Sequence, residues 1–134
     1  MKTGKKIVLS IIAIILVLFI IGAVQFSNYI KEGSAKLEAI VFEGVDLSKV
    51  ENGVYEGDYD TGIIYAKVKA TVNSGKIENL ELLEHKNGRG GPAEVIVDQI
   101  VNQQVVELDD ISGATGSSRV IKKAVEVALK KGIQ

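Results

Sequence analysis

Apolar residues are concentrated near the amino terminus of this chain of 134 residues. The run from Ile7 to Val24 carries no charged residue. As a helix it would be about 27 Å long, close to the roughly 30 Å hydrocarbon thickness of a bilayer. A core helix that is apolar on all sides would need a larger domain around it. We therefore expect a transmembrane helix, extended by Gln25 and Phe26 into the interface, and assign residues 1–26 to a cytoplasmic tip and membrane anchor.

A period of two follows in the middle of the chain. Even positions from Ala66 to Val72 are apolar and the intervening ones are polar, which is typical of a half-buried strand. Residues 73–76 supply turn chemistry, and residues 77–85 are predicted to form the returning strand. Upstream, residues 53–59 have strand composition, with glycines where a bulge or a close backbone approach is expected. The pattern predicts a small antiparallel sheet.

Two helical patterns complete the domain. Pro92 suits the first turn of a helix, which is predicted to run to Gln104, and we expect a short strand at residues 105–106. The last helix is predicted to follow Ser117 and to stop at Gly132. Its charged residues, expected mostly on the face opposite the apolar one, are Arg119, Lys122, Lys123, Glu126 and Lys130. The predicted fold class is α+β: a small antiparallel sheet with two packed helices, preceded by one N-terminal transmembrane helix.

The segment between the anchor and the sheet is mostly polar. Residues 27–52 are interpreted as a juxtamembrane stalk, helical through Lys36, and residues 53–134 as the folded domain. Lysines precede the apolar run at three positions with no acid among them, which favours a cytoplasmic N-terminus and an outward-facing domain. A cleaved secretory signal is the alternative, although residues 22–25 do not resemble a cleavage site.

Composition excludes several functions. Beyond residue 30 the chain has 16 − 3 = 13 basic and 17 acidic residues, and this net charge of −4 does not suit nucleic-acid binding. The chain has no cysteine and one histidine. Disulfides, thiolate metal sites, iron–sulfur clusters and histidine-rich zinc sites are therefore excluded. Any redox chemistry must come from an organic cofactor.

The segment from Leu108 to Ser118 is dense in small and hydroxyl-bearing residues. Small side chains allow a ligand to approach the backbone, and the amides that open the next helix favour an anion such as a phosphate. Without further information the segment is equally well described as a flexible turn followed by an N-terminal cap, Ser117 or Ser118. The two interpretations are compatible with each other.

Seven residues of this segment form a fixed pattern, namely Asp109, Ser112, Gly113, Ala114, Thr115, Ser117 and Ser118. The pattern resembles the flavinylation motif of small FMN-binding domains. That family includes peripheral subunits of sodium-translocating NADH:quinone reductases and Rnf-type complexes, and membrane-tethered domains of bacterial extracellular electron transfer. The likeness covers residues 53–131 and includes Gly53-x-Tyr55-x-Gly57, Gly75-Lys76-Ile77 and His85.

The resemblance implies a cofactor and a partner. FMN would be joined through its phosphate to the hydroxyl of Thr115 by a separate flavin transferase that uses FAD and a divalent metal. Gly113 and Ala114 would let the phosphate approach, and Asp109 would fix the loop or be recognised by the transferase. The protein would be an electron-transfer carrier in a bacterial cell membrane rather than a stand-alone enzyme. It would accept electrons from a membrane donor such as a quinone-linked dehydrogenase.

The likeness has one departure. Larger members of the family often carry a Glu-Thr-Pro element after the histidine, whereas residues 86–92 here are rich in glycine. Contacts of that element with the flavin ring are therefore not carried over. His85 has a role either towards the flavin or in the structure, while Arg89, Tyr55 and Tyr59 are weaker candidates for the phosphate and the ring.

Two other functions remain open at this point. The same phosphate site would serve a module that binds FMN or another phosphorylated ligand reversibly. A membrane-tethered interaction domain without a cofactor would also fit the anchor and the small fold.

Overall fold

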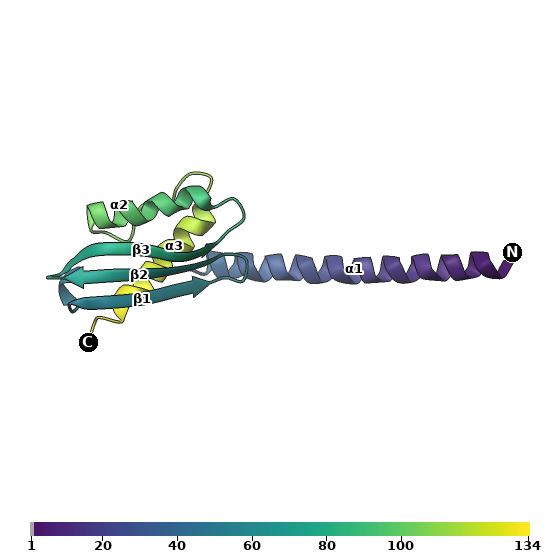
Figure 1. The fold of residues 1–134 in the computed structure, drawn as a ribbon, viewed down its shortest axis with the longest axis horizontal. Coiled ribbons are helices and arrows are strands. Elements are labelled where there is room, and N and C mark those ends of the chain that lie inside the picture. Colours follow the sequence, from purple (N-terminus) through teal and green to yellow (C-terminus); the bar gives the residue numbers. More distant parts are fainter. Residues whose placement is uncertain (1) are drawn as a thin grey trace.

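The computed structural model describes residues 2–134 as one long helix joined to a small α+β domain (Figure 1). The predicted fold class is confirmed. The elements in chain order are α1 (Lys2–Glu38), the 3₁₀ turn η1 (Leu47–Lys49), β1 (Gly53–Asp60), β2 (Tyr65–Asn73), β3 (Lys76–Lys86), the 3₁₀ turn η2 (Gly91–Val95), α2 (Ile96–Gln103) and α3 (Thr115–Lys130).

The sheet is an antiparallel meander in the order β1-β2-β3. In the central strand β2, the predicted alternation is confirmed, because Ala66, Val68, Ala70 and Val72 are all buried. The β2–β3 turn passes through Ser74 and Gly75, both with positive φ. The sheet therefore presents one apolar face to the rest of the domain.

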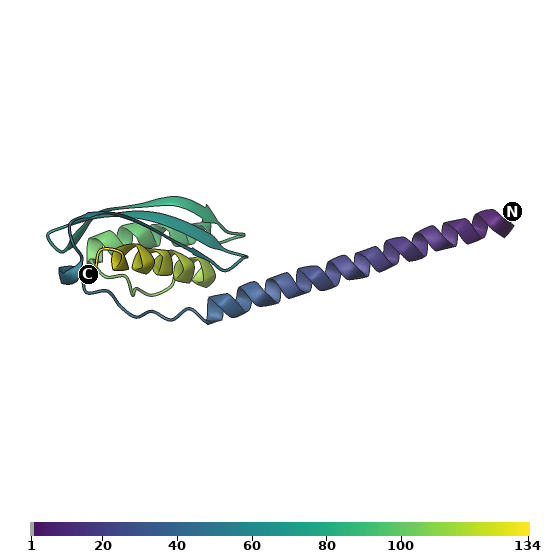
Figure 2. The ribbon, with the colours of Figure 1, turned by 90° about the horizontal axis from the view of Figure 1, so that it is seen from below.

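The helices α3 and α2 form the second layer, on that apolar face (Figure 2). Gly57 in β1 lies so close to α3 that a Cβ atom there would be 2.4 Å from the carbonyl oxygen of Ala124 and the amide nitrogen of Ala128. The predicted close approach at a glycine of the first strand is thus confirmed. This contact packs the C-terminal half of α3 against the sheet.

The expected strand at residues 105–106 is wrong. The chain there is irregular, and α2 ends in Gln104 with a left-handed backbone. The Gln104 amide accepts a hydrogen bond from Ile77 N–H at 2.8 Å and donates one to Ile77 C=O at 2.9 Å. Because one side chain occupies both hydrogen-bonding groups of Ile77, no strand pairs with the sheet edge there. The helix expected from Pro92 begins instead as η2 and becomes α-helical at Ile96.

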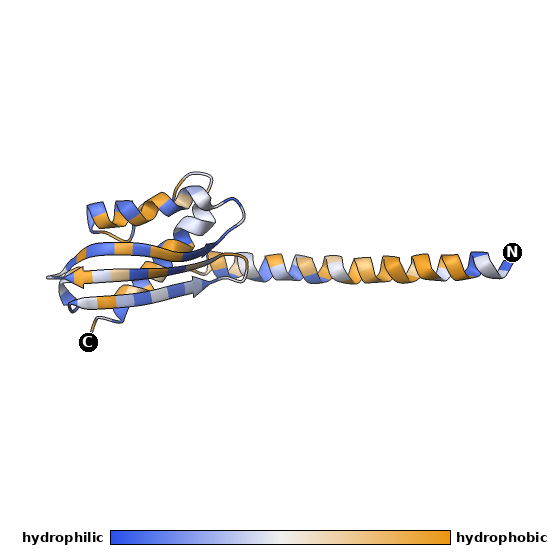
Figure 3. Ribbon diagram, viewed as in Figure 1, coloured by the Kyte–Doolittle hydropathy of each residue, from blue (hydrophilic) through white to orange (hydrophobic). Residues whose placement is uncertain are grey.

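The N-terminal helix α1 projects away from the domain (Figures 1 and 3). It continues without a break to Glu38, twelve residues beyond the predicted anchor boundary at residue 26. Its apolar part is exposed, and the helix is long and apolar enough to cross a membrane.

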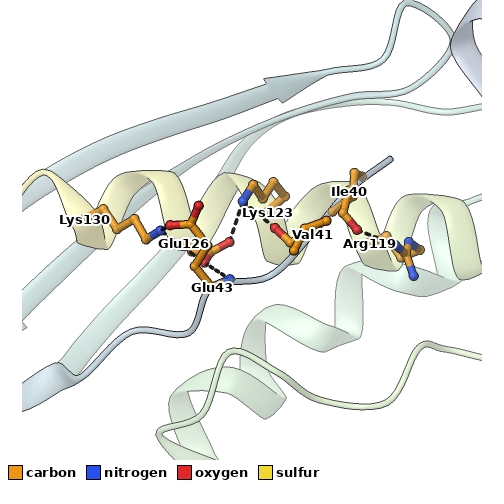
Figure 4. A network of polar contacts seen from close by, with 7 residues as sticks. All are labelled: Ile40, Val41, Glu43, Arg119, Lys123, Glu126 and Lys130. Atoms are coloured by element: carbon orange, nitrogen blue, oxygen red, sulfur yellow. Dashed lines mark hydrogen bonds and ion pairs between the residues drawn. The ribbon is translucent and has the colours of Figure 1, made fainter. Parts of the chain in front are cut away.

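Residues 40–50, predicted as part of a polar stalk, pack against the domain. The side chains of Ile40 and Val50 join the hydrophobic core. Arg119 and Lys123 of α3 donate hydrogen bonds to the backbone carbonyls of Ile40 and Val41, each at 2.8 Å (Figure 4). We call residues 40–43 the strap. The assignment of residues 27–52 as a separate unit remains a prediction.

A buried carboxylate fastens the end of the strap. Glu126 of α3 is 1% exposed, accepts a hydrogen bond from the backbone N–H of Glu43 at 2.7 Å, and pairs with Lys123 at 2.8 Å and Lys130 at 3.5 Å (Figure 4). Burial alone would raise the pKa of Glu126. The hydrogen bonds from Lys123 and Glu43, together with the charges of the two lysines, hold the pKa below its usual value instead. The carboxylate is thus charged when folded and ties the strap to α3.

Candidate functional site

The loop before α3 is held in place from behind by the helix itself. Lys122 donates to the Leu108 carbonyl at 2.6 Å and pairs with Asp110 at 2.7 Å. The hydroxyl of Ser118 accepts a hydrogen bond from Ile111 N–H at 2.9 Å and donates to the Ala114 carbonyl at 2.8 Å. Two side chains of α3 therefore fix the start and the end of the loop.

Helix α3 begins earlier than expected. Its first residue is Thr115, and its N-cap is Ala114, whose side chain makes no capping hydrogen bond. The prediction that Ser117 or Ser118 caps the helix is wrong. Gly113, with a φ of 77°, turns the chain into the helix two residues before Thr115. Ser118 hydrogen-bonds to the carbonyl four residues before it, as serines within helices commonly do.

The three hydroxyls at the start of α3 lie in different surroundings. Ser117 is 2% exposed and Ser118 is 0% exposed, and both hydroxyls have hydrogen-bond partners within the domain. Thr115 is exposed, and no hydrogen bond of its hydroxyl is found within residues 2–134. Of these three oxygens, only that of Thr115 is accessible from outside.

The first turn of α3, which begins at Thr115, contains backbone amides without acceptors. The N–H of Ala114 donates to the Ile111 carbonyl at 2.9 Å, and that of Ser118 to the Ala114 carbonyl at 2.9 Å. Within the described chain, the intervening N–H groups of Thr115, Gly116 and Ser117 have no acceptor, as is usual in the first turn of a helix. These donors and the helix dipole favour a negatively charged group at this position.

His85 at the end of β3 lies directly behind this turn. Its side chain is 3% exposed, with Nε2 at 3.0 Å from Ser117 Oγ and Nδ1 at 2.9 Å from Glu94 Oε1. Asn87 Nδ2 also lies 3.2 Å from Nδ1, so both ring nitrogens are engaged within the domain. The sequence placed His85 and Ser117 among the candidates but did not reveal the link to Glu94.

Gly90 packs against the hydroxyl of Ser117, the partner of His85. A Cβ atom at Gly90 would lie 1.9 Å from Ser117 Oγ. The glycine-rich segment after His85 thus covers Ser117, which explains why that hydroxyl is buried while Thr115 is not.

The other candidates are distributed unevenly. Asp109 and Ser112 are exposed in the loop, near Thr115 in sequence. Arg89 is also exposed. Tyr55 lies at the C-terminal end of α3, far from Thr115, because its ring is beside Gly132 and its hydroxyl donates to the Glu51 carbonyl. The rise of α3 separates that end from Thr115 by about 24 Å, so the suggestion that Tyr55 stacks on a ligand at the site is wrong.

The residues present fit a phosphate ester of the kind that the sequence motif implies. Thr115 offers an accessible hydroxyl, and unpaired amides lie beside it. At Gly113 a Cβ atom would meet nothing within 4 Å, so the loop side of the hydroxyl is open. The site has an accessible hydroxyl oxygen, donors for an anion and open space on the loop side at Gly113.

Comparison with known proteins identifies one family. No curated protein matches the chain. The sequence model of one family, described as the FMN-binding domain, matches residues 62–130, which is 69 of the 134 residues. The match contains β2, β3, α2, the loop and α3 up to its last residue. The chain therefore belongs to the FMN-binding domain family.

Proposed function

We propose that this protein is a membrane-anchored, extracytoplasmic flavoprotein that carries FMN esterified through its phosphate to Thr115. It acts as an electron-transfer carrier, because bound flavin supplies the redox chemistry and the chain supplies position and electrostatics. The proposal builds on family membership, which accounts for FMN, and on the long apolar helix, which is consistent with a membrane anchor.

The accessibility of Thr115 is the observation that carries the attachment. Ser117 and Ser118 are closer to the body of the domain and their oxygens are engaged, whereas Thr115 stands at the first position of α3. Attachment at Thr115 leaves the hydrogen bonds that hold the loop intact. Attachment at Ser118 would break two of them.

The attachment step needs an external enzyme. Thr115 Oγ1 would form a bond to the phosphorus of the FMN half of FAD, the pyrophosphate bond would break, and AMP would leave. A threonine hydroxyl is a poor nucleophile unless a base removes its proton. The nearest acid–base chain, Glu94–His85–Ser117, ends on Ser117. We therefore assign the base and the divalent metal to a flavin transferase.

The chain's own residues stabilise the product. The amides of Thr115, Gly116 and Ser117 face the position of the phosphate charge. Gly113 and Ala114 leave space for the phosphate, while Ser118 holds the loop in the geometry that the transferase recognises. Asp109 and Ser112, both exposed, are available for contact with the transferase.

The topology follows from the charges that flank the apolar run. Lys2, Lys5 and Lys6 stay in the cytoplasm, so α1 crosses once and the domain lies outside. A covalent link suits that location, because a dissociated flavin would diffuse away. The electron donor in this proposal is a membrane component such as a quinone-linked dehydrogenase.

Intact-mass measurement tests the attachment. Protein co-expressed with a flavin transferase should gain the mass of FMN less one water, and Thr115→Val, which removes only the hydroxyl at an exposed position, should not. Thr115→Ser keeps the hydroxyl and should still gain mass. A wild-type chain of unmodified mass, or a gain that survives Thr115→Val, contradicts the proposal.

Acid precipitation distinguishes covalent from reversible binding. Ester-linked flavin should remain with the pellet, whereas a module that binds FMN reversibly would release the flavin into the supernatant. Protein that is colourless in the presence of the transferase would point to an interaction domain without a cofactor.

A further inference from the structure

A cavity of about 480 Å³ lies where α1 meets the domain. Its walls include Tyr29 from α1, Gly62 and Ile63 from the β1–β2 turn, Tyr65 from β2 and Lys86 from β3. The volume is within the range of small-molecule sites. The lining residues from α1 and the β1–β2 turn place the cavity at the α1 end of the domain. Helix α3 begins at the same end (Figures 1 and 2).

The last turns of α1 are attached to the domain. The Tyr29 hydroxyl donates to the Gly62 carbonyl. A Cβ atom at Gly33 would lie 2.5 Å from the side chain of Ile63, so α1 and the β1–β2 turn are in close contact there. The helix thus forms a fixed wall of the cavity.

This wall continues to the attachment residue. A Cβ atom at Gly116 would lie 3.1 Å from Leu37 of α1 and 2.9 Å from Ile64. Gly116 directly follows Thr115, and Tyr29 is about 12 Å along α1 from Leu37. One end of the wall is therefore beside Thr115, and the other end lines the cavity.

We propose that this cavity receives the isoalloxazine ring of the FMN carried on Thr115, and that Tyr29 of the anchor helix forms one of its walls. The inference rests on the proposed function. The phosphate would stay at the start of α3, and the ribityl chain would pass Leu37 and Ile64 to the cavity. Tyr29 and Tyr65 supply the aromatic surface that a flat ring system packs against.

A second cavity is a less suitable place for the flavin ring. It measures about 320 Å³, lies between β3 and α2, and includes Leu83, His85 and Val97. It has no aromatic residue other than His85 in its lining. His85 of this cavity contacts Ser117, whose hydroxyl is buried against Gly90, so a ligand attached to the exposed Thr115 has no open path along that contact.

The position of Tyr29 sets the depth of the ring relative to the membrane. Tyr29 is five residues, about 7.5 Å, beyond the end of the apolar run at Val24. That distance places it in the outer interfacial layer of a bilayer, where tyrosine is enriched. The ring would then lie at the membrane surface, within reach of a donor that moves in the plane of the membrane.

Flavin fluorescence tests the aromatic wall. A phenol ring in contact with oxidised flavin quenches its fluorescence by electron transfer. In flavinylated full-length protein in lipid nanodiscs, Tyr29→Ala should give a several-fold rise in fluorescence, and alanine suits the helix at this exposed position. Leu83→Ala, in the second cavity, is the matched control and should leave the fluorescence unchanged.

The midpoint potential supplies an independent readout. The lining of the cavity has one cation, Lys86, and two carboxylates, Asp60 and Glu84. A positive charge stabilises the negative charge that reduction brings to the ring, and the carboxylates oppose it. Lys86→Gln should therefore lower the potential. Lys76→Gln, at the opposite end of β3 and about 33 Å away, should not.

The outcomes separate the two proposals. If every variant carries FMN on Thr115 and neither Tyr29→Ala nor Lys86→Gln changes its readout, the cavity assignment is overturned while the proposed function stands. A rise in fluorescence with Leu83→Ala alone would place the ring in the second cavity and also overturn it. A wild-type chain without bound FMN would overturn both the cavity assignment and the proposed function.

Discussion

The two ends of α3 differ in how closely they are packed and in how their polar groups are paired. Towards its C-terminus, Gly57 brings the sheet into contact with the helix backbone, and the buried Glu126 has partners on three residues. At its N-terminus, the Thr115 hydroxyl is exposed and three amides lack acceptors within the described chain. Polar groups are fully paired at one end and available at the other.

This contrast indicates where binding capacity resides. A buried polar group without a partner is costly, so a domain of this size pairs nearly all of them. Unpaired donors persist cheaply where solvent or a ligand reaches them, and the first turn of α3 is such a position. Ser118 lies at the boundary, since it is buried like Glu126 but orders the loop that leads to Thr115.

Disrupting the contact between Gly57 and the C-terminal half of α3 should have the largest effect on stability. Gly57→Val would place side-chain atoms within 2.4 Å of the α3 backbone, which cannot move without separating helix and sheet. We expect a loss of about 3 kcal/mol or more in the free energy of unfolding, measured by chemical denaturation. Gly88→Ala is the control, because a Cβ atom there meets nothing within 4 Å. Equal stability of the two variants would contradict the close packing.

Removing the buried carboxylate should cost somewhat less. Glu126→Ala leaves Lys123 and the strap without their shared partner, and we expect a loss of about 2–3 kcal/mol, since Lys130 remains partly exposed to solvent. Denaturation curves would measure it. Glu43→Gln, which changes an exposed partner of Lys130, should have only a small effect. A larger loss for Glu43→Gln than for Glu126→Ala would show that the buried pair is unimportant.

Ser118→Ala tests the boundary between the two ends. It removes two hydrogen bonds from the loop and should cost about 1–2 kcal/mol in unfolding free energy. Ser112→Ala, in the exposed part of the same loop, should change stability by less than about 0.5 kcal/mol. The loop would not depend on Ser118 if both variants unfolded at the same denaturant concentration.

The pH dependence of stability should show the smallest of these effects. The pKa of Glu126 is lower in the folded chain than in the unfolded chain, so its contribution is present above the unfolded value of about 4.3 and is lost as the pH falls through the folded value. Unfolding free energy should therefore decline below about pH 4.3 more steeply in the wild type than in Glu126→Gln. Parallel profiles would contradict the lowered pKa.

Several of these features were predictable because they leave a local pattern. The alternation from Ala66 to Val72 matches the pleat of β2. The length and composition of the apolar run from Ile7 to Val24 were enough to predict a helix that could cross a membrane. The resemblance to a flavinylation motif made Thr115 a candidate through residue types at fixed spacing. Local periodicity and short motifs are the information that a single sequence carries directly.

Other features depend on contacts that have no local pattern. The strap is held through the backbone carbonyls of Ile40 and Val41, which any residue type supplies. Its residues were therefore assigned to the stalk, although three of the four are apolar. The start of α3 depended on the positive φ of Gly113 rather than on a serine cap. The positions of Lys122 and Glu126 became clear only when their distant partners were located.

Peptide mapping of the flavinylated protein tests the central claim most directly. Thr115 lies within a few residues of Ser112, Ser117 and Ser118, so one proteolytic peptide can contain all four hydroxyls. Tandem mass spectrometry of that peptide should locate the FMN phosphate on Thr115 and show the three serines unmodified. FMN located on any of these serines, or no flavin on this peptide in the presence of an active flavin transferase, would contradict it.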